Sequence, residues 1–478
     1  MSFHKPFTNY LYFSFFLLLI SSCKLLSPPE KQPLPSLAKM PASFDGNTDS
    51  TSLGDIAWNN FFNDEYLVNL IDIALKNNLD QLVAIQRIEM ARANYAIAQG
   101  ATLPSLDVRF RARSGNIYNN LLSGTIYGDR NTVTQTQNHF LGLQSTWEID
   151  LWGRLKNRRK AAYARFLATE RGQHLLTTTL VAEVARLYYE LLGLDNELEA
   201  IEKNIELQET ALEIIKIQKI GGRATELAVQ QFHAQLLRTQ SLGYEKRQRI
   251  TELENQLNLL LGRYPQTIPR GESILLQHLP EIVNTGVPAD LLLRRPDIQQ
   301  QELELIAAKA DLEAARAAFL PSVTITPYAG LHSRSIPSLF NTPESLVLGF
   351  LGGITAPIFQ NRIIRSEHSR SAALNKEAFY AYQRSILTAY QEVMTNLQKV
   401  ENYKKAYALR EQEAEVLTSA VSTSNDLFMA GYASYLEVIT AQGSVLDAEL
   451  NKANTRKEIF LALIDLYRSL GGGWTQTP

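Results

Sequence analysis

The residue types that carry out catalysis are sparse in this chain and fall into no recognisable catalytic pattern. It has one cysteine and seven histidines in 478 residues. The sequence contains no Gly-x-Ser-x-Gly nucleophile motif, no glycine-rich phosphate loop and no His-Glu-x-x-His zinc motif. Scattered histidines and a single thiol cannot assemble a metal cluster. We therefore expect a protein that is not an enzyme and that needs no cofactor and no metal.

The only cysteine, Cys23, is the one residue with a clear signal for covalent modification. It follows an apolar run of 11 residues, Tyr10 to Ile20, which is too short to span a membrane and fits the core of a signal peptide. The segment Ile20-Ser21-Ser22-Cys23 resembles a bacterial lipid-attachment site, which implies a signal peptide over 1–22 and acyl chains such as palmitate on Cys23. An inert buried thiol is the alternative.

Several acyl chains would hold the mature N-terminus firmly at a membrane, because each buried CH₂ contributes about 0.8 kcal/mol. Lys24 follows the cysteine, where an aspartate would be expected in a lipoprotein kept at the inner membrane. By the same resemblance to bacterial lipoproteins, we expect the outer membrane. Five prolines between Lys24 and Ser52 predict an extended tether from that anchor to the fold.

A switch from helix to strand occurs twice and reveals an internal duplication. Good helix formers precede Leu320-Pro321, and alternating β-branched residues follow it; Leu103-Pro104 stands at a similar switch. Proline disfavours helix in the residue before it, so a helix must end at both places. Further downstream, Gly222 matches Gly431 and Leu261 matches Leu470, each 209 residues apart. A repeat of this length predicts two copies of one structural unit.

Hydrophobic periodicity predicts the same series of elements in each copy. Strict alternation predicts strands, whereas long proline-free stretches with helical periodicity predict helices. The expected strands are 106–113, 141–151, 322–331 and 345–354, with a polar loop over 114–138. The expected helices are 64–100, 153–220, 225–261, 289–319, 361–430 and the return from 431 to 470. The 68 residues of 153–220 would span about 100 Å, more than any globular core requires.

These elements divide the chain into six parts. A signal peptide (1–22) precedes a lipidated N-terminus and tether (23–63). The first repeat covers 64–263 and the second 289–470, with an irregular segment, 264–288, between them and a C-terminal tail, 471–478. The fold class is α+β with four strands for each chain.

Four alternating strands of about ten residues match transmembrane β-strands in length. Four strands cannot close a barrel, and lipid does not tolerate an open sheet edge. Several chains must therefore contribute to one barrel, and three copies would give a 12-stranded transmembrane β-barrel with an aqueous lumen, continued by a long α-helical barrel. The alternative is a soluble α+β domain that carries ordinary coiled-coil hairpins.

The chain resembles the TolC-like outer membrane efflux proteins, and specifically their lipoprotein branch. The likeness covers roughly Gly54 to Trp474, in order and through both repeats. The matching segments are Val287-Pro288-Ala289-Asp290-Leu291-Leu292-Leu293-Arg294-Arg295-Pro296-Asp297-Ile298, Ala315-Arg316-Ala317-Ala318-Phe319-Leu320-Pro321-Ser322, Ala356-Pro357-Ile358-Phe359, Gly431-Tyr432-Ala433-Ser434-Tyr435-Leu436-Glu437-Val438 and Leu470 to Trp474.

The resemblance implies a homotrimer in the outer membrane that docks with a periplasmic adaptor protein and an inner-membrane transporter. Such a trimer would be a passive exit duct for small molecules. Two other functions stay open: the outer membrane component of a type I protein secretion system, and a non-conducting lipoprotein that bridges the envelope layers. A net charge of −2 gives no reason to expect nucleic-acid binding.

The resemblance also points to site residues at the helix turns Gly221-Gly222 and Gly431, which would form the periplasmic tip. These glycines can be simple helix caps, or can also shape the docking surface and gate. Glu437 is the one acid at the expected pore constriction, because Ala228 and Thr440 stand where relatives often carry acids. Whether Glu437 faces the lumen or the outer surface stays open at this point.

Two further features lie next to the expected membrane strands. A basic run, Arg154 to Lys160, opens the first long helix, with Arg362 and Arg365 in the matching place of the second repeat. These side chains can be a solvated face, or can contact anionic lipid headgroups. Trp147 and Trp152 fit either an aromatic girdle at the membrane surface or simple packing.

Overall fold

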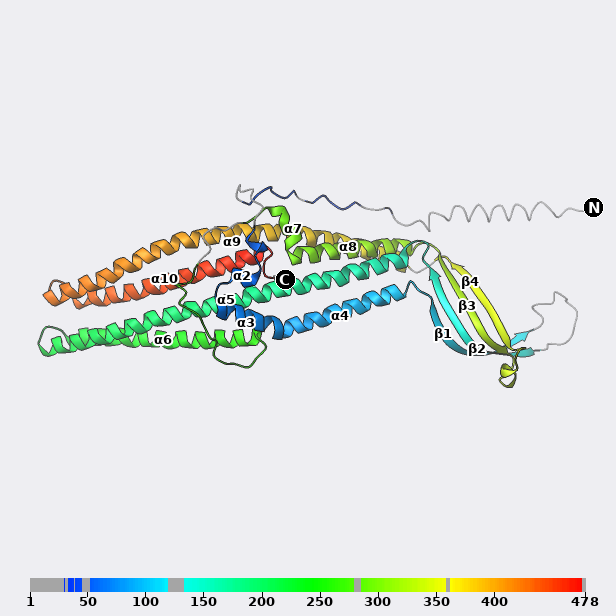
Figure 1. Ribbon diagram of the computed structural model, residues 1–478, viewed down its shortest axis with the longest axis horizontal. Coiled ribbons are helices and arrows are strands. Elements are labelled where there is room, and N and C mark those ends of the chain that lie inside the picture. The colour runs from blue at the N-terminus through cyan, green and yellow to red at the C-terminus, as the bar shows by residue number, and fades with distance from the viewer. Residues whose placement is uncertain are drawn as a thin grey trace, which may run out of the picture. The chain divides into compact units, whose positions relative to one another are not determined.

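The structure is a computed structural model of the chain, and it describes residues 30, 33–37, 39–44, 52–118, 133–278, 285–357 and 362–474. The described residues form two compact units, shown together in Figure 1. Unit 1 comprises residues 89–167 and 303–380 together with the N-terminal residues up to 36. Unit 2 comprises the other segments, 37–88, 168–302 and 381–478.

Unit 1 contains a single antiparallel sheet of four strands in the order β1-β2-β3-β4. The strands are β1 (Ser105–Tyr118), β2 (Val133–Ile149), β3 (Ser322–Ser333) and β4 (Leu346–Thr355). They lie side by side in chain order in Figure 1. Pairing in chain order makes the sheet a simple up-and-down meander, although β2 and β3 are far apart in the sequence.

Four helices begin or end next to these strands in unit 1. They are α4 (Leu79–Gly100), α5 (Arg154–Ile220), α8 (Pro296–Ala317) and α9 (Ile363–Ala430). The α5 and α8 helices meet through Ala161, Ala164, Ala307 and Ala310, whose small side chains allow a close helix approach. An ion pair from Arg165 to Asp311 lies on the same two helices.

Unit 2 is built from two long helical hairpins. The first joins α5 to α6 (Glu226–Leu260), and the second joins α9 to α10 (Tyr435–Ser469). The two members of each kind are nearly equal in length, 67 and 68 residues for α5 and α9 and 35 for both α6 and α10. The remaining elements are α2 (Trp58–Phe61), α3 (Glu65–Asn77), α7 (Leu291–Arg294) and the 3-10 turns η2 (Leu53–Asp55) and η4 (Pro288–Asp290). A further 3-10 turn, η5 (Pro337–Phe340), precedes β4 in unit 1.

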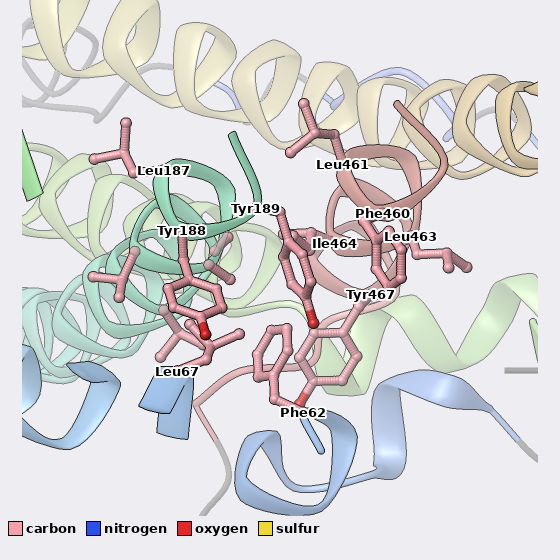
Figure 2. Close-up of a cluster of buried hydrophobic side chains, with 14 of the residues drawn as sticks. Phe62, Leu67, Leu187, Tyr188, Tyr189, Phe460, Leu461, Leu463, Ile464 and Tyr467 are labelled. Carbon is pink, nitrogen blue, oxygen red and sulfur yellow. The ribbon is translucent and has the colours of Figure 1, made fainter. Parts of the chain in front are cut away.

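The main hydrophobic core lies in unit 2, where α3 packs against the middle of α5 and the end of α10. Figure 2 shows part of it, with Tyr188, Tyr189 and Leu67 around the aromatic side chains of α10. The Tyr467 ring stacks on Phe61 with centroids 4.1 Å apart. Buried apolar side chains of this size contribute about 1.5–3 kcal/mol each. The core therefore ties the N-terminal segment to both repeats.

A buried polar cluster centred on Asp64 accompanies this core. The Tyr188 hydroxyl donates to Asp64 Oδ2 at 2.6 Å and accepts from the backbone N–H of Gly271 at 2.9 Å. Asp64 Oδ1 accepts from the backbone N–H of Tyr66, which caps α3. Burial and the hydrogen bond to Asp64 raise the pKa of Tyr188, so its hydroxyl stays protonated and donates.

A second buried cluster surrounds Arg295, at the junction of α7 and α8. Its guanidinium donates to Asp297 at 2.7 and 3.0 Å, to Glu392 on α9 at 2.7 Å, and to the backbone oxygen of Ser469 on α10 at 3.1 Å. Burial alone would lower the pKa of Arg295, but the two carboxylates raise it overall and keep it charged. This residue joins α8 to both helices of the second hairpin.

The structure confirms the predicted long helices and the four strands. It differs from the prediction in three places. The predicted helix 64–100 is two helices, α3 and α4, separated by the extended residue Asn78. The predicted helix 289–319 is divided at Arg295-Pro296 into α7 and α8. The predicted loop 114–138 is shorter, because β1 continues to Tyr118 and β2 begins at Val133.

Among the described residues, no helix combines sufficient length with sufficient apolar character to cross a bilayer.

Candidate membrane sheet and helix-tip turns

One face of the sheet is apolar across all four strands. The register places Val108 opposite Leu143, Leu143 opposite Ala329 and Ala329 opposite Leu348, which makes a continuous row. Residues directly opposite each other in antiparallel strands point to the same face. Most of the large side chains of this face are exposed: Leu106, Val108, Phe110, Leu143, Trp147, Leu346, Leu348, Phe350 and Ile354. An exposed apolar surface of this kind marks contact with lipid or with a partner.

The opposite face is polar and less regular. One row consists of Asp107, Gln144, Tyr328 and Gly349. The next row along the strands begins with Arg109 and continues through Gly142 and Gly330 to Val347. The sheet thus separates an apolar surface from a hydrogen-bonding surface, as alternation in the sequence predicts.

The first and last strands are the two edges of this sheet. Within the described part of the chain, β1 pairs only with β2 and β4 pairs only with β3. Each edge therefore presents a row of backbone N–H and C=O groups that no described strand satisfies. The even number of antiparallel strands makes the two edges run in opposite directions.

Each helix-to-strand junction receives a hydrogen bond from a tryptophan. Trp147 Nε1 donates to the backbone oxygen of Thr102 at 3.2 Å, and Trp152 Nε1 donates to that of Pro321 at 2.7 Å. At each repeated junction, an indole N–H therefore donates to a backbone oxygen of the residues between helix and strand. Both rings are also exposed, 40% for Trp147 and 50% for Trp152. The contact explains local packing and is compatible with an aromatic girdle.

The start of α5, where the basic run lies, is stabilised by two carboxylates. Arg154 donates to both Glu148 oxygens at 2.6 Å, and Asp150 Oδ2 accepts from the backbone N–H of Lys156 at 2.7 Å. Negative groups at a helix N-terminus also interact favourably with its dipole. Lys156, Arg158 and Lys160 are exposed, and contact of this run with lipid headgroups stays a prediction.

The two helix tips have the same backbone geometry. At the first, the N–H of Gly222 donates to Lys219 O at 3.0 Å and that of Arg223 to Gln218 O at 2.8 Å. At the second, the N–H of Gly431 and Tyr432 donate to Phe428 O and Leu427 O at 3.0 and 2.8 Å. Both pairs of bonds are those of a Schellman C-cap.

Only one glycine at each tip is required by its backbone. The φ of Gly222 is 72° and that of Gly431 is 79°, in the left-handed region that side chains disfavour. Gly221, the other predicted tip glycine, has no positive φ and no close neighbouring atom other than carbonyl oxygens of its own helix. The structure therefore places the helix cap at Gly222 and Gly431.

Glu437, the predicted constriction residue, lies in the first turn of α10. Its carboxylate accepts a hydrogen bond from the backbone N–H of Ser434 and completes a capping box with that residue. The side chain is exposed in the single chain. Glu437 therefore stabilises the start of α10, and this role does not depend on whether its side chain faces a pore.

The first tip has no acid at the matching position. Ala228, which is 209 residues before Glu437, is fully buried, and its N–H donates to Thr225 Oγ1 at 3.2 Å. It belongs to a cluster with Leu212, Ile215, Phe232, Leu236 and Val438, which joins α5 and α6 to α10. This cluster brings α10 of the second hairpin against both helices of the first, near the tips.

Several residues of this site illustrate the limits of sequence reasoning. The predicted lipid-attachment residue, Cys23, lies outside the described residues. In the sequence, the arginines of β1 indicate only an alternating strand. The sheet shows that three of them lie on its polar face. Arg295 lies in the family-like segment from Val287 to Ile298, but its contacts with Glu392 and Ser469 appear only in the folded chain.

Comparison with known proteins gives a family match over both repeats. The family model of the outer membrane efflux proteins matches residues 70–263 and 287–472. The solvent efflux pump outer membrane protein SrpC of Pseudomonas putida is 30% identical over 96% of this chain and 97% of its own length. The probable outer membrane lipoprotein SilC of Salmonella typhimurium is 27% identical over 96% of this chain and 98% of its own length.

Solved structures give the same result for the fold. A crystal structure of CusC, from work on its folding and transmembrane channel formation, superposes with a TM-score of 0.79 at 27% identity. The superposition covers 93% of this chain and 99% of that chain.

Proposed function

The chain belongs to the outer membrane efflux protein family, and we propose that three copies of it form the exit duct of a tripartite efflux pump. As an outer membrane efflux channel, the protein conducts cargo passively. The observation that carries the proposal is the four-stranded sheet, which has a continuous exposed apolar face and two edges that no described strand of the chain pairs with. The apolar face of such a sheet needs a lipid environment, and the backbone groups of its edges need further strands as hydrogen-bond partners.

Three chains satisfy both requirements. The β4 edge of one chain can pair with the β1 edge of the next, and the pairing is antiparallel because each chain contributes an even number of strands. Twelve strands leave an aqueous lumen, with the apolar face toward lipid and the polar face inward. The helices of 67 and 68 residues then continue the duct as an α-helical barrel on the periplasmic side.

The partners follow from the family. SrpC is named as the outer membrane protein of a solvent efflux pump, and we propose that this chain likewise works with a periplasmic adaptor and an inner-membrane transporter. The paired helix tips, with exposed Ile217, Ile220, Tyr432 and Leu436, are the surface available for docking. Relatives named for solvent efflux favour small molecules over the secreted proteins of a type I system.

Planar-bilayer recording on the purified full chain tests the function. We expect stepwise conductance increases as channels insert, because the polar face lines a continuous lumen. A protein that inserts as a trimer without any conductance, even when voltage and pH are varied, would support an envelope-bridging lipoprotein instead. Deletion of the gene should raise sensitivity to small toxic compounds, whereas a loss of protein secretion alone would favour the type I system.

The lipid anchor is proposed at Cys23. In cells given a fatty-acid analogue, the wild-type chain should become labelled and Cys23→Ser should not. Because the strands also hold the protein in the membrane, we expect the variant to remain in the outer membrane fraction. Labelling of Cys23→Ser at the wild-type level would refute the anchor without affecting the pore.

For Glu437, the capping box allows its charge to be separated from its structural role. Glu437→Gln keeps an oxygen that can accept from Ser434 but removes the charge, whereas Glu437→Ala removes both. If three copies of Glu437 face the lumen, both variants should lose block by multivalent cations added on the tip side. If Glu437 only caps α10, Glu437→Gln should keep the wild-type block, and Glu437→Ala should cost about 1 kcal/mol of local helix stability.

A further inference from the structure

Three arginines project from one face of the edge strand β1. Arg109, Arg111 and Arg113 alternate with Val108, Phe110 and Ala112, so they share the polar face of the sheet. Alternate residues of a strand are about 7 Å apart, so the three guanidinium groups follow one line along the strand. We name these three residues the arginine ladder.

The arginine ladder is largely uncompensated within its own sheet. Arg109 lies 3.8 Å from Asp107, and both side chains are about half exposed. Among the residues that the structure describes, Arg111 and Arg113 form no ion pair. Their direct partners on β2 are Phe140 and Asn138, and that of Arg109 is Gly142, none of which is charged.

The other strands supply little negative charge at this height. The sequences of β3 and β4 contain no aspartate or glutamate. The only acid of β2 is Glu148, which binds Arg154 and lies beyond the residues that pair with β1. Glu344 lies outside β4, two residues before the strand begins at Leu346. A neighbouring chain that pairs its β4 with this β1 would therefore add no acid to the arginine ladder.

The apolar face decides which way the arginines point. Val108 and Phe110 lie on the opposite side of the same strand and at the same height as Arg109 and Arg111. An arginine on the lipid side of a barrel costs about 2–4 kcal/mol near the bilayer midplane. In a closed barrel, the arginine ladder must therefore line the lumen.

We propose that the arginine ladder gives the membrane part of the lumen a positive potential, which favours anionic cargo and slows cations. This inference rests on the proposed trimeric duct and specifies the charge of what passes through it. Three chains would bring nine arginines around one axis, and charged pore walls of this kind raise the local concentration of ions of opposite sign. The effect is opposite in sign to the one expected from Glu437 at the tip.

The rate at which charged reagents modify a cysteine beside the arginine ladder depends on the local potential. This rate can be measured without passing ions through the helix tips. Asn138 is exposed and lies directly opposite Arg113. In isolated trimers of Asn138→Cys, we would measure the rates of modification by two thiosulfonates of similar size, one with a sulfonate group and one with a quaternary ammonium group. The ratio of these rates cancels any change in thiol reactivity. The chain without the new cysteine supplies the background from Cys23.

We expect the ratio of the sulfonate rate to the ammonium rate to be severalfold higher at Asn138→Cys than for a free thiol in solution. The double change Arg111→Gln/Arg113→Gln should bring the ratio close to the free-thiol value. The matched double change Arg247→Gln/Arg249→Gln removes the same charge from exposed positions of α6 and should leave the ratio unchanged. A ratio that does not respond to loss of the two ladder arginines would overturn the proposal.

A salt titration keeps the test decisive if the double variant does not assemble. In Asn138→Cys alone, the excess rate of the sulfonate reagent should decline as ionic strength rises, because screening shortens the range of the field. A salt-independent ratio equal to that of a free thiol would also overturn the inference. Failure to obtain trimers from any variant, including wild type, would instead contradict the proposed duct itself.

Discussion

Substitution of Phe350 by arginine is expected to prevent assembly of the trimer in the outer membrane. Phe350 lies on the apolar face of β4, opposite Pro327, and is 76% exposed in the single chain. An arginine facing lipid costs about 2–4 kcal/mol near the midplane, and three chains would bring roughly 6–12 kcal/mol to each barrel. That penalty is comparable to the whole stability of an ordinary folded protein.

The next residue supplies a matched control. Leu351 is also exposed, but it pairs with Thr326 on the polar face of the same strand. Leu351→Arg should therefore assemble nearly as well as wild type, because its charge reaches water in the lumen. The measurement is the fraction of chain recovered as trimer from outer membranes. Equal recovery of the two variants would show that the apolar face does not contact lipid.

Loss of Arg295 is expected to have the largest effect on the stability of the helical unit. Its side chain is 7% exposed and binds Asp297, Glu392 and the end of α10. Removing one partner of a buried ion pair costs about 3–5 kcal/mol, because the charges that remain are left without compensation. Arg295→Met should therefore lower the midpoint of thermal unfolding, followed by helical circular dichroism.

Arg294 is the control for this effect, because it is adjacent in sequence but differs in surroundings. Its ion pairs are to Asp55 and Asp290, whose side chains are 50% and 30% exposed, and its own side chain is 21% exposed, against 7% for Arg295. Exposed pairs contribute about 0–1 kcal/mol, so Arg294→Met should shift the midpoint only slightly. The interpretation of Arg295 as the buried tie between α8, α9 and α10 would be wrong if both variants unfolded alike.

The long helices and the strands could be predicted because their periodicity is local and repeated. Periodicity alone could not predict the break at Asn78, which combines a local cap contact to Gln81 with a contact far away in the chain. Asn78 Nδ2 donates to Leu260 O at 2.9 Å, and its Oδ1 accepts from the N–H of Gln81 at 3.1 Å. The first contact joins residues 182 positions apart. Periodicity cannot reveal such a partner.

The strand ends were missed for a different reason. The sequence beyond Arg113 and before Asn138 is rich in polar residue types, so apolar alternation ends although the backbone pairing of β1 and β2 continues. For Glu437 the signal was present: Ser434 and Glu437 have the spacing of a capping box. The resemblance implies a pore position for Glu437, and the structure adds its hydrogen bond to the backbone N–H of Ser434.

The claim that three chains complete one barrel is tested most directly by the mass of the purified, detergent-solubilised protein. After correction for bound detergent, we expect three times the mass of one mature chain, because the edges of β1 and β4 must pair in lipid. A folded, stable monomer, extracted from the outer membrane and unchanged on concentration, would contradict the shared barrel and the exit duct proposed from it.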